Sequence, residues 1–438
     1  MQGDFNMYIG IDLGTTGCKT VMYGGDGRVL CEYNREYELI FRDGFVEQDA
    51  NEWWRLVCEG LSYVVEKSGV CDVRGISVST QSISFVPVDK NGRTLDNAVS
   101  WLDLRADEQC ERLKEHFGEK YIYDVTGKFC LCDYSLPKLM WLKEHKPDIY
   151  FAADKILFPL DFLNFKLCGR AVCDYTVAGG SMAYDIHGRC WSRELLDFAG
   201  IDERKLPEVG CMGEKVGMLL PEVCKVCGIS GRCAVYLGGQ DQKLAALGAG
   251  IEKDVCTVSF GTATAISKLC ENDGGASLFR FSDSEYISEL ALMTTGAALR
   301  WLSRTLYGSM SYKEMDALAE NSAPGAGGVV FESDLSSGGA IRGLTLSTTS
   351  ADIVYALYEG VSGDIAKAVE SLGGADRLKV FGGGAKSDIW CRILARIANI
   401  PVEVLDTAET ASLGAAMLAS EYKIRPAGVN KILYPENN

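Results

Sequence analysis

One local design occurs twice in this chain: a short apolar strand enters a Gly-Thr turn and leaves as a second strand. The first copy spans residues 8–23 around Gly14-Thr15, and the second spans residues 254–266 around Gly261-Thr262. A single Gly-Thr turn is common in ordinary β-hairpins, but two copies in matching contexts indicate an internal duplication. The chain is therefore expected to form two similar halves, each with one such turn, that face one another across a cleft.

Short apolar segments alternate with helical patterns along the whole chain. The glycine cluster Gly382–Gly384, for example, follows the predicted strand Leu378–Phe381. Helices are predicted at Glu52–Val65, Asp103–Leu113, Leu136–Lys143, Ile156–Leu167, Arg193–Ala199, Asp241–Gly248 and Ile389–Ala398. This alternation predicts an α/β fold. A length of 438 residues fits two domains, which we assign to residues 1–237 and 238–438.

The composition excludes several classes of partner. Lys and Arg number 44 against 60 Asp and Glu, and the formal net charge is -16. An acidic chain lacks the basic surface that nucleic acid or an anionic membrane requires. No apolar run approaches the roughly 20 residues of a membrane span, and residues 1–7 do not resemble a signal peptide. We therefore expect a cytoplasmic protein.

The 17 cysteines fall mostly singly inside apolar segments, as Cys256 and Cys391 do. The pairs Cys130–Cys132 and Cys224–Cys227 suggest a metal site. A structural zinc site needs four Cys or His ligands, however, and the sequence has three histidines and no second Cys-x-x-Cys. Most of the cysteines are therefore expected to be reduced, buried and structural.

The two Gly-Thr turns suit phosphate binding. Glycine lets backbone N–H groups approach phosphate oxygens, and Thr15, Thr16 and Thr262 add hydroxyl donors. Asp12 supports this interpretation, because a carboxylate on an apolar strand is costly to bury unless it binds a metal or a donor. Mg²⁺ held largely through water would suit it. The P-loop and Rossmann glycine patterns are both absent, and the alternative is two ordinary β-hairpins.

Asp241 stands where a predicted strand ends in Gly238-Gly239 and a helical run begins. A carboxylate at this junction can act as a general base that takes a proton from a substrate hydroxyl as that oxygen attacks the γ-phosphorus. The same carboxylate can instead cap the helix. The residues alone leave both alternatives open.

Motifs from about Tyr8 to Ala427 resemble the FGGY carbohydrate kinases, within the sugar-kinase and actin superfamily. Each motif is weak alone, but together and in family order they are highly specific. They are Ile11–Thr16, Trp101–Ala106, Lys138–Leu142, Gly238–Gln242, Phe260–Thr262, Gly343-Leu344, Asp352–Glu359, Gly382–Ser387 and Glu409–Ala416. Asp133 and Leu357 depart from the residue types usual in the family.

The resemblance implies two ribonuclease-H-like domains, with the sugar held mainly by the first and ATP mainly by the second. It implies that Asp241 is the catalytic base and that Asp12 and Asp241 hold Mg²⁺. The residues that it implies for ATP binding are Gly14, Thr15, Thr16, Gly261, Thr262, Gly296, Ala297, Gly383, Gly384 and Ala385. Those expected to contact the sugar are Gln81, Ser82, Trp101, Asp103, Arg105, Asp241 and Gln242.

The substrate signal is weaker than the family signal. Asp103 and Arg105 can pair with sugar hydroxyls or with each other as a structural salt bridge. Xylulokinase-like members usually have Gln-Met-His-Gly where this chain has Gln81–Ser84, and the charged side chains of glycerol-kinase-like members are missing there. A pentulose such as xylulose is the predicted substrate. Another ketose, a polyol and an aldonate are the alternatives.

The predicted activity is transfer of the γ-phosphate of ATP to a hydroxyl of a small sugar or polyol. A non-catalytic nucleotide-binding protein on the same fold is the alternative from another class. The retained Asp241 and both Gly-Thr turns favour the kinase, and an NAD-dependent oxidoreductase lacks its fingerprint. We expect no nucleic-acid or membrane partner, and a homodimer is left open.

Overall fold

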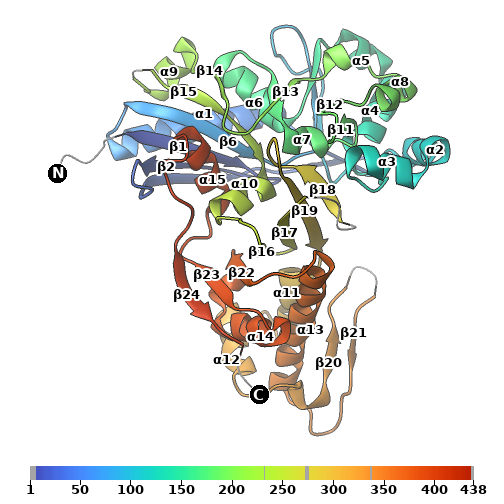
Figure 1. Ribbon diagram of the computed structural model, residues 1–438, viewed down its shortest axis with the longest axis vertical. Coiled ribbons are helices and arrows are strands. Elements are labelled where there is room, and N and C mark those ends of the chain that lie inside the picture. Colours follow the sequence, from blue (N-terminus) through green and yellow to red (C-terminus); the bar gives the residue numbers. More distant parts are fainter. Residues whose placement is uncertain (1–5, 231, 272–275, 336–337, 436–438) are drawn as a thin grey trace. The chain divides into compact units, whose positions relative to one another are not determined.

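The computed structural model describes residues 6–230, 232–271, 276–335 and 338–435 (Figure 1). The chain forms two compact units. The first unit contains Met1–Gly248, Ser277–Tyr286 and Ala411–Pro426, and the second contains Ala249–Ala276, Ile287–Thr410 and Ala427–Asn438. The chain therefore leaves the first unit after Gly248 and returns to it twice.

The first unit is built on a six-stranded sheet with the spatial order β14, β15, β6, β1, β2, β3. Their bounds are Lys215–Met218, Ala234–Gln240, Val73–Thr80, Met7–Leu13, Gly17–Gly24 and Val29–Glu36. β1, β6 and β15 run parallel, whereas β14, β2 and β3 pair antiparallel with their neighbours. Because β1 is buried along almost its whole length, its sequence is a continuous apolar run instead of an alternating one.

Helices pack on this sheet through apolar stripes. α1 (Ala50–Ser68) begins at the N-cap Asp49 and ends at Gly69, whose φ of 69° is the left-handed conformation that closes a helix. Its buried stripe contains Trp53 and Leu61 at helical spacing. α6 (Pro159–Cys168) packs against α1 and against β6 and β15.

α10 (Asp241–Gly248) and α15 (Thr410–Ala419) pack on each other in the first unit, where Leu244, Ala415 and Leu418 form a small apolar cluster. α15 also lies directly on β1. A Cβ added to Gly10 would lie 1.9 Å from the backbone oxygen of Ser412, so β1 needs glycine at this position. Figure 1 shows α15 beside β1, although the two come from opposite ends of the chain.

In the second unit, six strands of a seven-stranded sheet follow the spatial order β19, β17, β16, β22, β23, β24. Their bounds are Tyr286–Leu292, Thr264–Cys270, Val255–Phe260, Arg377–Phe381, Val402–Leu405 and Val429–Leu433. β16, β22 and β23 run parallel, while β17 and β24 are antiparallel to β16 and β23. This is the strand arrangement of the first unit, which confirms the duplication that the two Gly-Thr turns predict.

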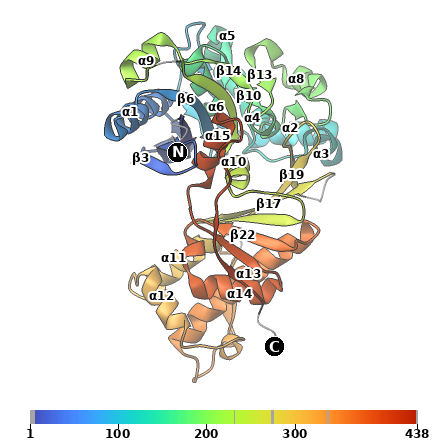
Figure 2. The same ribbon diagram turned by 60° about the vertical axis from the view of Figure 1, so that its left-hand side comes forward.

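α13 (Ser350–Ser371) and α14 (Asp388–Ala398) contact each other beside this second sheet, and both views show them together (Figures 1 and 2). α12 (Tyr312–Ala319) contacts both helices. The core between helices and sheet includes Cys256 and Cys391, so these two cysteines are buried as predicted.

Shorter elements complete both units. In the first unit they are β4 (Ile40–Arg42), β5 (Phe45–Gln48), β7 (Val86–Val88), β8 (Ala98–Val99), α2 (Asp107–Phe117), α3 (Glu119–Thr126), α4 (Ser135–His145), α5 (Pro147–Ala152), β9 (Lys155–Leu157), β10 (Val172–Asp174), α7 (Tyr175–Gly179), β11 (Tyr184–Asp185), β12 (Cys190–Trp191), α8 (Arg193–Ala199), β13 (Glu208–Gly210), α9 (Pro221–Cys227) and β18 (Ser277–Arg280). In the second unit they are α11 (Thr295–Leu306), β20 (Val330–Glu332) and β21 (Ala340–Arg342).

The structure differs from the sequence-based expectations in three places. The first long segment of the first unit ends after Gly248, not after residue 237, because β15 continues through the Gly-Gly pair directly into α10. The helix predicted at Ile156–Leu167 is a strand followed by α6, which begins at Pro159, a residue suited to the first helical turn. The helix predicted from Asp103 begins at Asp107.

Candidate active site

Asp12 and Asp241 belong to one edge of the first sheet, where the parallel strands β1, β6 and β15 end. Asp12 of β1 stands in register with Ser79 of β6, and Ser79 stands in register with Gly239 of β15. The Ser79 hydroxyl donates to Asp12 Oδ1 at 2.7 Å. Open α/β sheets place their ligand sites at the carboxyl ends of parallel strands, so this edge is the first candidate.

A β-bulge lies just before Asp241. Tyr236 pairs with Ser77, but Gly239 pairs with Ser79, so β15 carries one extra residue between them. Gly238 fills the bulge, because a Cβ there would lie 1.7 Å from a backbone oxygen of β6. Bulges bend a strand and redirect the side chains that follow. Gly238, the first glycine of the pair before Asp241, is therefore required by the close approach of the β6 backbone.

Asp241 is the first residue of α10 and is half-buried. Its Oδ1 accepts a hydrogen bond from the backbone N–H of Gln242 at 2.7 Å. A capping side chain normally accepts from the N–H two or three residues further on. The observed bond to the adjacent residue holds one oxygen of this carboxylate at the start of α10.

A buried carboxylate holds the backbone that carries Asp241. Asp174 caps α7, and its Oδ2 accepts from the Thr176 hydroxyl at 2.7 Å. The same hydroxyl accepts from the backbone N–H of Gln240 at 2.9 Å, and Gln240 directly precedes Asp241. Burial raises the pKa of Asp174 to about 6. Asp174 and Thr176 thus fix the end of β15 and were not singled out from the sequence.

The first Gly-Thr turn is held through its carbonyl oxygens. The Tyr37 hydroxyl donates to the Gly14 oxygen, the Tyr37 N–H donates to the Thr16 oxygen at 2.9 Å, and Gln48 Nε2 donates to the Thr15 oxygen at 2.8 Å. Two residues from later segments of the chain therefore set the shape of this turn.

Two of the predicted sugar-binding residues meet this turn. Trp101 Nε1 donates to Thr15 Oγ1 at 2.8 Å. Gln81 is buried, and its Nε2 donates to Gln48 Oε1 at 3.1 Å. Ser82 is half-buried, with its hydroxyl facing Gly180. The structure thus brings Thr15, Trp101 and Gln81 into one polar network, in which the Gln81 amide is already engaged by Gln48.

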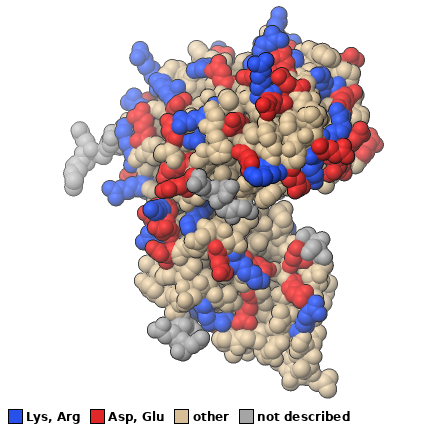
Figure 3. All heavy atoms as spheres, turned by 45° about the vertical axis from the view of Figure 1, so that its right-hand side comes forward, with Lys and Arg blue, Asp and Glu red and all other residues tan. Residues whose placement is uncertain are grey.

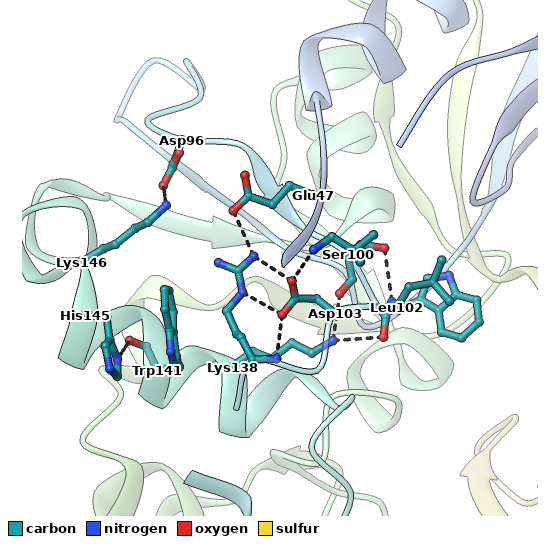
Figure 4. A network of polar contacts seen from close by, with 12 residues as sticks. Glu47, Asp96, Ser100, Leu102, Asp103, Lys138, Trp141, His145 and Lys146 are labelled. Atoms are coloured by element: carbon teal, nitrogen blue, oxygen red, sulfur yellow. Dashed lines mark hydrogen bonds and ion pairs between the residues drawn. The ribbon is translucent and has the colours of Figure 1, made fainter. Parts of the chain in front are cut away.

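Asp103 and Arg105 form the structural salt bridge that the sequence left as an alternative (Figure 4). Their side chains are 0% and 1% exposed, and Arg105 Nε donates to Asp103 Oδ1 at 2.7 Å. Arg105 also donates to Glu47 at 3.0 Å, and its guanidinium lies over the rings of Phe45 and Trp141. This pairing keeps residues 103–105 in a loop, which explains the late start of α2.

Lys138 of α4 fixes the loop that carries Trp101. It is fully buried, and its Nζ donates to the backbone oxygens of Ser100 and Trp101 at 2.9 and 3.1 Å (Figure 4). Burial lowers the pKa of Lys138 to about 8. Asp133, one of the departures from the family pattern, is also largely buried, and this burial raises its pKa. Trp101 is therefore positioned by a polar network beneath it.

The second Gly-Thr turn opens on a cavity of about 720 Å³ within the second unit. Its lining brings together three segments that the sequence assigns to the nucleotide: Gly261-Thr262, Gly296 and Gly383-Gly384. The structure adds lining residues that were not assigned to the nucleotide from the sequence. Lys386 and Ser387 lie in the motif Gly382–Ser387, and the others are Leu299, Arg300, Tyr312, Lys313, Asp316 and Trp390.

Arg300 and the start of α11 support the second turn. Arg300 Nη2 donates to Thr262 Oγ1 at 2.6 Å. The N–H groups of Gly296 and Ala297 donate to the oxygens of Gly261 and Thr262 at 3.1 and 2.9 Å. These two amides therefore brace the turn. Ala297 does not belong to the cavity lining, and neither does Ala385, which is buried.

The site has no cage for a metal ion made of protein side chains alone. Across the described residues, no three His, Cys, Asp or Glu side chains gather into a metal-binding group. Mg²⁺ in kinases is usually held by one or two carboxylates together with substrate phosphates. Asp12 and Asp241, at the same sheet edge, are an oxygen donor set that fits this arrangement.

Figure 3 shows acidic and basic side chains interspersed on the face drawn. In the described ranges, no helix is both long and apolar enough to cross a membrane.

Two protein-family models match most of the chain. Residues 7–248 match the N-terminal domain of the FGGY family of carbohydrate kinases, and residues 278–421 match its C-terminal domain. The chain belongs to the FGGY family of carbohydrate kinases. It is therefore a carbohydrate kinase, a phosphotransferase that uses ATP, and the resemblance inferred from its motifs is confirmed.

Individual FGGY kinases resemble the chain over most of its length. The xylulose kinase of Bacillus subtilis is 30% identical over 437 residues, covering 94% of this chain and 87% of the relative. The L-fuculokinase of Escherichia coli is 30% identical over 365 residues, covering 79% of this chain and 77% of the relative.

Solved FGGY structures have the same fold. A ligand-bound xylulose kinase from Lactobacillus acidophilus has a TM-score of 0.92 at 24% identity, covering 98% of this chain and 94% of that one. A gluconate kinase from the same organism has a TM-score of 0.91 at 25% identity, with the same coverage. The α/β fold with two actin-like ATPase domains is thus confirmed.

Proposed function

We propose that the chain phosphorylates a pentulose such as xylulose, with Asp241 as the general base. The observation that carries the proposal is the position of Asp241. Asp241 starts a helix at the carboxyl edge of the first sheet, immediately after a bulge, and the strand-end carboxylate Asp12 lies at the same edge with β6 between their strands. A helix cap needs no bulge and no buried support, whereas a base must be held in one place.

The proposed step follows from the chemistry of a carboxylate facing a hydroxyl. Asp241 takes the proton of the sugar hydroxyl while that oxygen forms a bond to the γ-phosphorus of ATP. The bond from the γ-phosphorus to the bridging oxygen breaks, and ADP leaves with the electron pair. Trp101 offers a flat apolar face to the C–H groups of the sugar, and Ser82 and Gln242 supply polar contacts. Gln81, which is buried and bonded to Gln48, acts through Gln48 on the first Gly-Thr turn.

Mg²⁺ is the proposed metal, with Asp12 and Asp241 as the residues that would hold it. When bound, it neutralises charge on the transferred phosphoryl group. The residues Gly261, Thr262, Gly296, Gly383 and Gly384 are proposed to hold ATP, because they line one cavity. Gly14, Thr15 and Thr16 are proposed to approach the phosphates from the first unit.

The substrate is proposed from the relatives. Several curated relatives are xylulose kinases at 27–30% identity over 94% of this chain, which supports a pentulose. The gluconate kinase structure supports an aldonate as the second candidate, because it resembles the chain nearly as well as the xylulose kinase structure does.

A substrate panel tests this proposal. ATP consumption by the full chain would be measured with ketopentoses, L-fuculose, glycerol and other polyols, and gluconate. We expect the highest kcat/KM with xylulose. A higher kcat/KM with gluconate would replace the pentulose by an aldonate, and a higher value with L-fuculose or a polyol would contradict the pentulose directly.

A further inference from the structure

Asp316 of α12 lines the cavity of the second unit, and one of its two carboxylate oxygens is fully engaged. The Tyr358 hydroxyl donates to Asp316 Oδ1 at 2.6 Å, and the Ser387 hydroxyl donates to the same oxygen at 2.7 Å. No hydrogen bond reaches Asp316 Oδ2 from another described residue, and the side chain is only half-buried. The carboxylate therefore presents one acceptor oxygen that the protein does not use.

The two donors hold Asp316 rigidly. Ser387 is the N-cap of α14, and its Oγ accepts from the Trp390 N–H at 3.2 Å, so its own proton is available for Asp316. Tyr358 is fully buried, with its ring stacked on Trp390 at 4.5 Å between centroids. Both hydroxyl oxygens are therefore held in place by packed elements of the second unit. Rigid placement of a group that the fold itself does not satisfy is typical of ligand recognition.

The chemistry of the lining divides the cavity into two parts. Near the Gly-Thr turn, Thr262 and the guanidinium of Arg300 suit phosphate oxygens. The carboxylate of Asp316 repels phosphate and requires an N–H or O–H donor. The lining beside Asp316 also includes Trp390, which is buried against Tyr358.

We propose that Asp316 Oδ2 accepts a hydrogen bond from the exocyclic amino group of adenine and thereby selects adenine over 6-oxo purines. This inference rests on the proposed placement of ATP in the cavity. A 6-oxo group in the same place would put a carbonyl oxygen against the carboxylate, which leaves both acceptors unsatisfied and repelling each other.

The test is nucleotide binding to the full chain without sugar, measured by calorimetry with ADP, IDP and 2′-deoxy-ADP. We expect ADP to bind at least about tenfold more tightly than IDP, since an unpaired polar group in a binding site is costly. The affinity for 2′-deoxy-ADP should stay close to that for ADP.

Asp316→Asn sharpens the test because the two hydroxyl donors require an acceptor. They should hold the amide oxygen where Oδ1 was, so that the amide NH₂ faces the cavity in place of Oδ2. The acceptor becomes a donor, and the preference should move from ADP towards IDP. Glu320→Gln is the matched control: it also removes one negative charge, directly after α12, but Glu320 pairs with Arg392 and does not line this cavity. It should leave the ADP-to-IDP ratio unchanged.

Several outcomes decide the matter. Equal binding of ADP and IDP to the unchanged chain would overturn the assignment of Asp316, even if the Asn variant failed to fold. Weak binding of 2′-deoxy-ADP together with equal binding of ADP and IDP would assign the carboxylate to the ribose instead. If no nucleotide bound, the proposed placement of ATP in this cavity would also be wrong. If ADP bound tightly but IDP bound equally well, only the role of Asp316 would be wrong.

Discussion

The two units share a strand order and a helix order, yet they carry different chemistry at matching positions. β1, β2, β6 and β15 of the first unit correspond to β16, β17, β22 and β23 of the second, and α10 corresponds to α15. Asp12 precedes the first Gly-Thr turn at the place where Ser259 precedes the second. On the adjacent parallel strand, Asp12 stands in register with Ser79 of β6. Ser259 stands in register with Phe381 of β22.

The turns themselves are held in different ways. Side chains from later segments, Tyr37 and Gln48, bond to the carbonyl oxygens of the first turn. The backbone N–H groups that begin α11 do the same for the second turn. The duplication thus preserves a backbone shape, while the carboxylates proposed for catalysis occur in one unit alone. This division implies that substitutions at matching positions should have unequal effects.

The largest difference in kcat is expected between substitutions at the first residues of α10 and α15. Asp241 begins α10, and Thr410 begins the corresponding helix α15. Asp241→Asn keeps the size and an acceptor oxygen but cannot take a proton at neutral pH, so kcat should fall by about 10²–10⁴-fold. ADP affinity should remain unchanged. Thr410→Ser should leave kcat near its original value.

Thermal unfolding provides the control for Asp241→Asn, because an unfolded variant decides nothing. A folded variant with near-normal turnover would show that Asp241 is not the base.

The second difference concerns the strand ends. Asp12→Asn retains an oxygen that can accept from Ser79 but loses the charge. The Mg²⁺ concentration for half-maximal activity should therefore rise by about 10–100-fold, as when a group that positions a bound metal is removed. Ser259→Ala at the matching position should not change the Mg²⁺ requirement. If both variants had the same Mg²⁺ dependence, Asp12 would be removed from the proposed metal site.

A smaller effect on kcat is expected from the hydrogen bonds that hold the backbone just before Asp241. Thr176→Val removes the hydroxyl that links Asp174 to the Gln240 N–H, while it keeps the side-chain volume. Because small displacements of a reacting group reduce the rate strongly, kcat should fall about tenfold while KM for ATP is unchanged. Thr176→Ser restores the hydroxyl and should restore kcat. A loss of stability with normal kcat would indicate a purely structural role.

The smallest effect is on the pH dependence of stability. Lys138 has a folded-state pKa of about 8, below its usual 10.5, so the unfolded chain binds more protons between these values. The contribution of Lys138 to stability should therefore rise with pH from about 8 to 10.5. Denaturant unfolding of the unchanged chain and of Lys138→Met should show this rise only in the former. The same slope in both would assign the effect to other groups.

The sequence was sufficient for those features that depend on local pattern. The two Gly-Thr turns, the glycine cluster Gly382–Gly384 and the helix that begins at Asp241 all follow from neighbouring residues, and the family motifs added the fold. The boundary at residue 237 differs from the structure because a Gly-Gly pair signals a hinge and a β-bulge equally well. Only the facing strand β6 distinguishes the two.

The sequence could not predict hydrogen-bond partners that are far apart in the chain and that the fold brings together. Thr176 reaches Gln240 across many intervening residues. Tyr37, directly after β3, and Gln48, the last residue of β5, reach the first turn from separate segments. Asp316 lies on an ordinary amphipathic helix with no motif around it. One signal was available for Asp174: a buried Asp followed two residues later by Thr is a capping pattern, although it does not reveal which backbone the Thr holds.

The position of α15 on β1 has a consequence for biosynthesis. β1 obtains its covering helix, residues 411–419, only after the whole of Ile287–Thr410 has been translated. Until then an apolar strand face around Gly10 lacks its native cover, and such exposed surface invites aggregation. Nascent chains halted before residue 410 should therefore depend on chaperones, while release of the full-length chain should end that dependence.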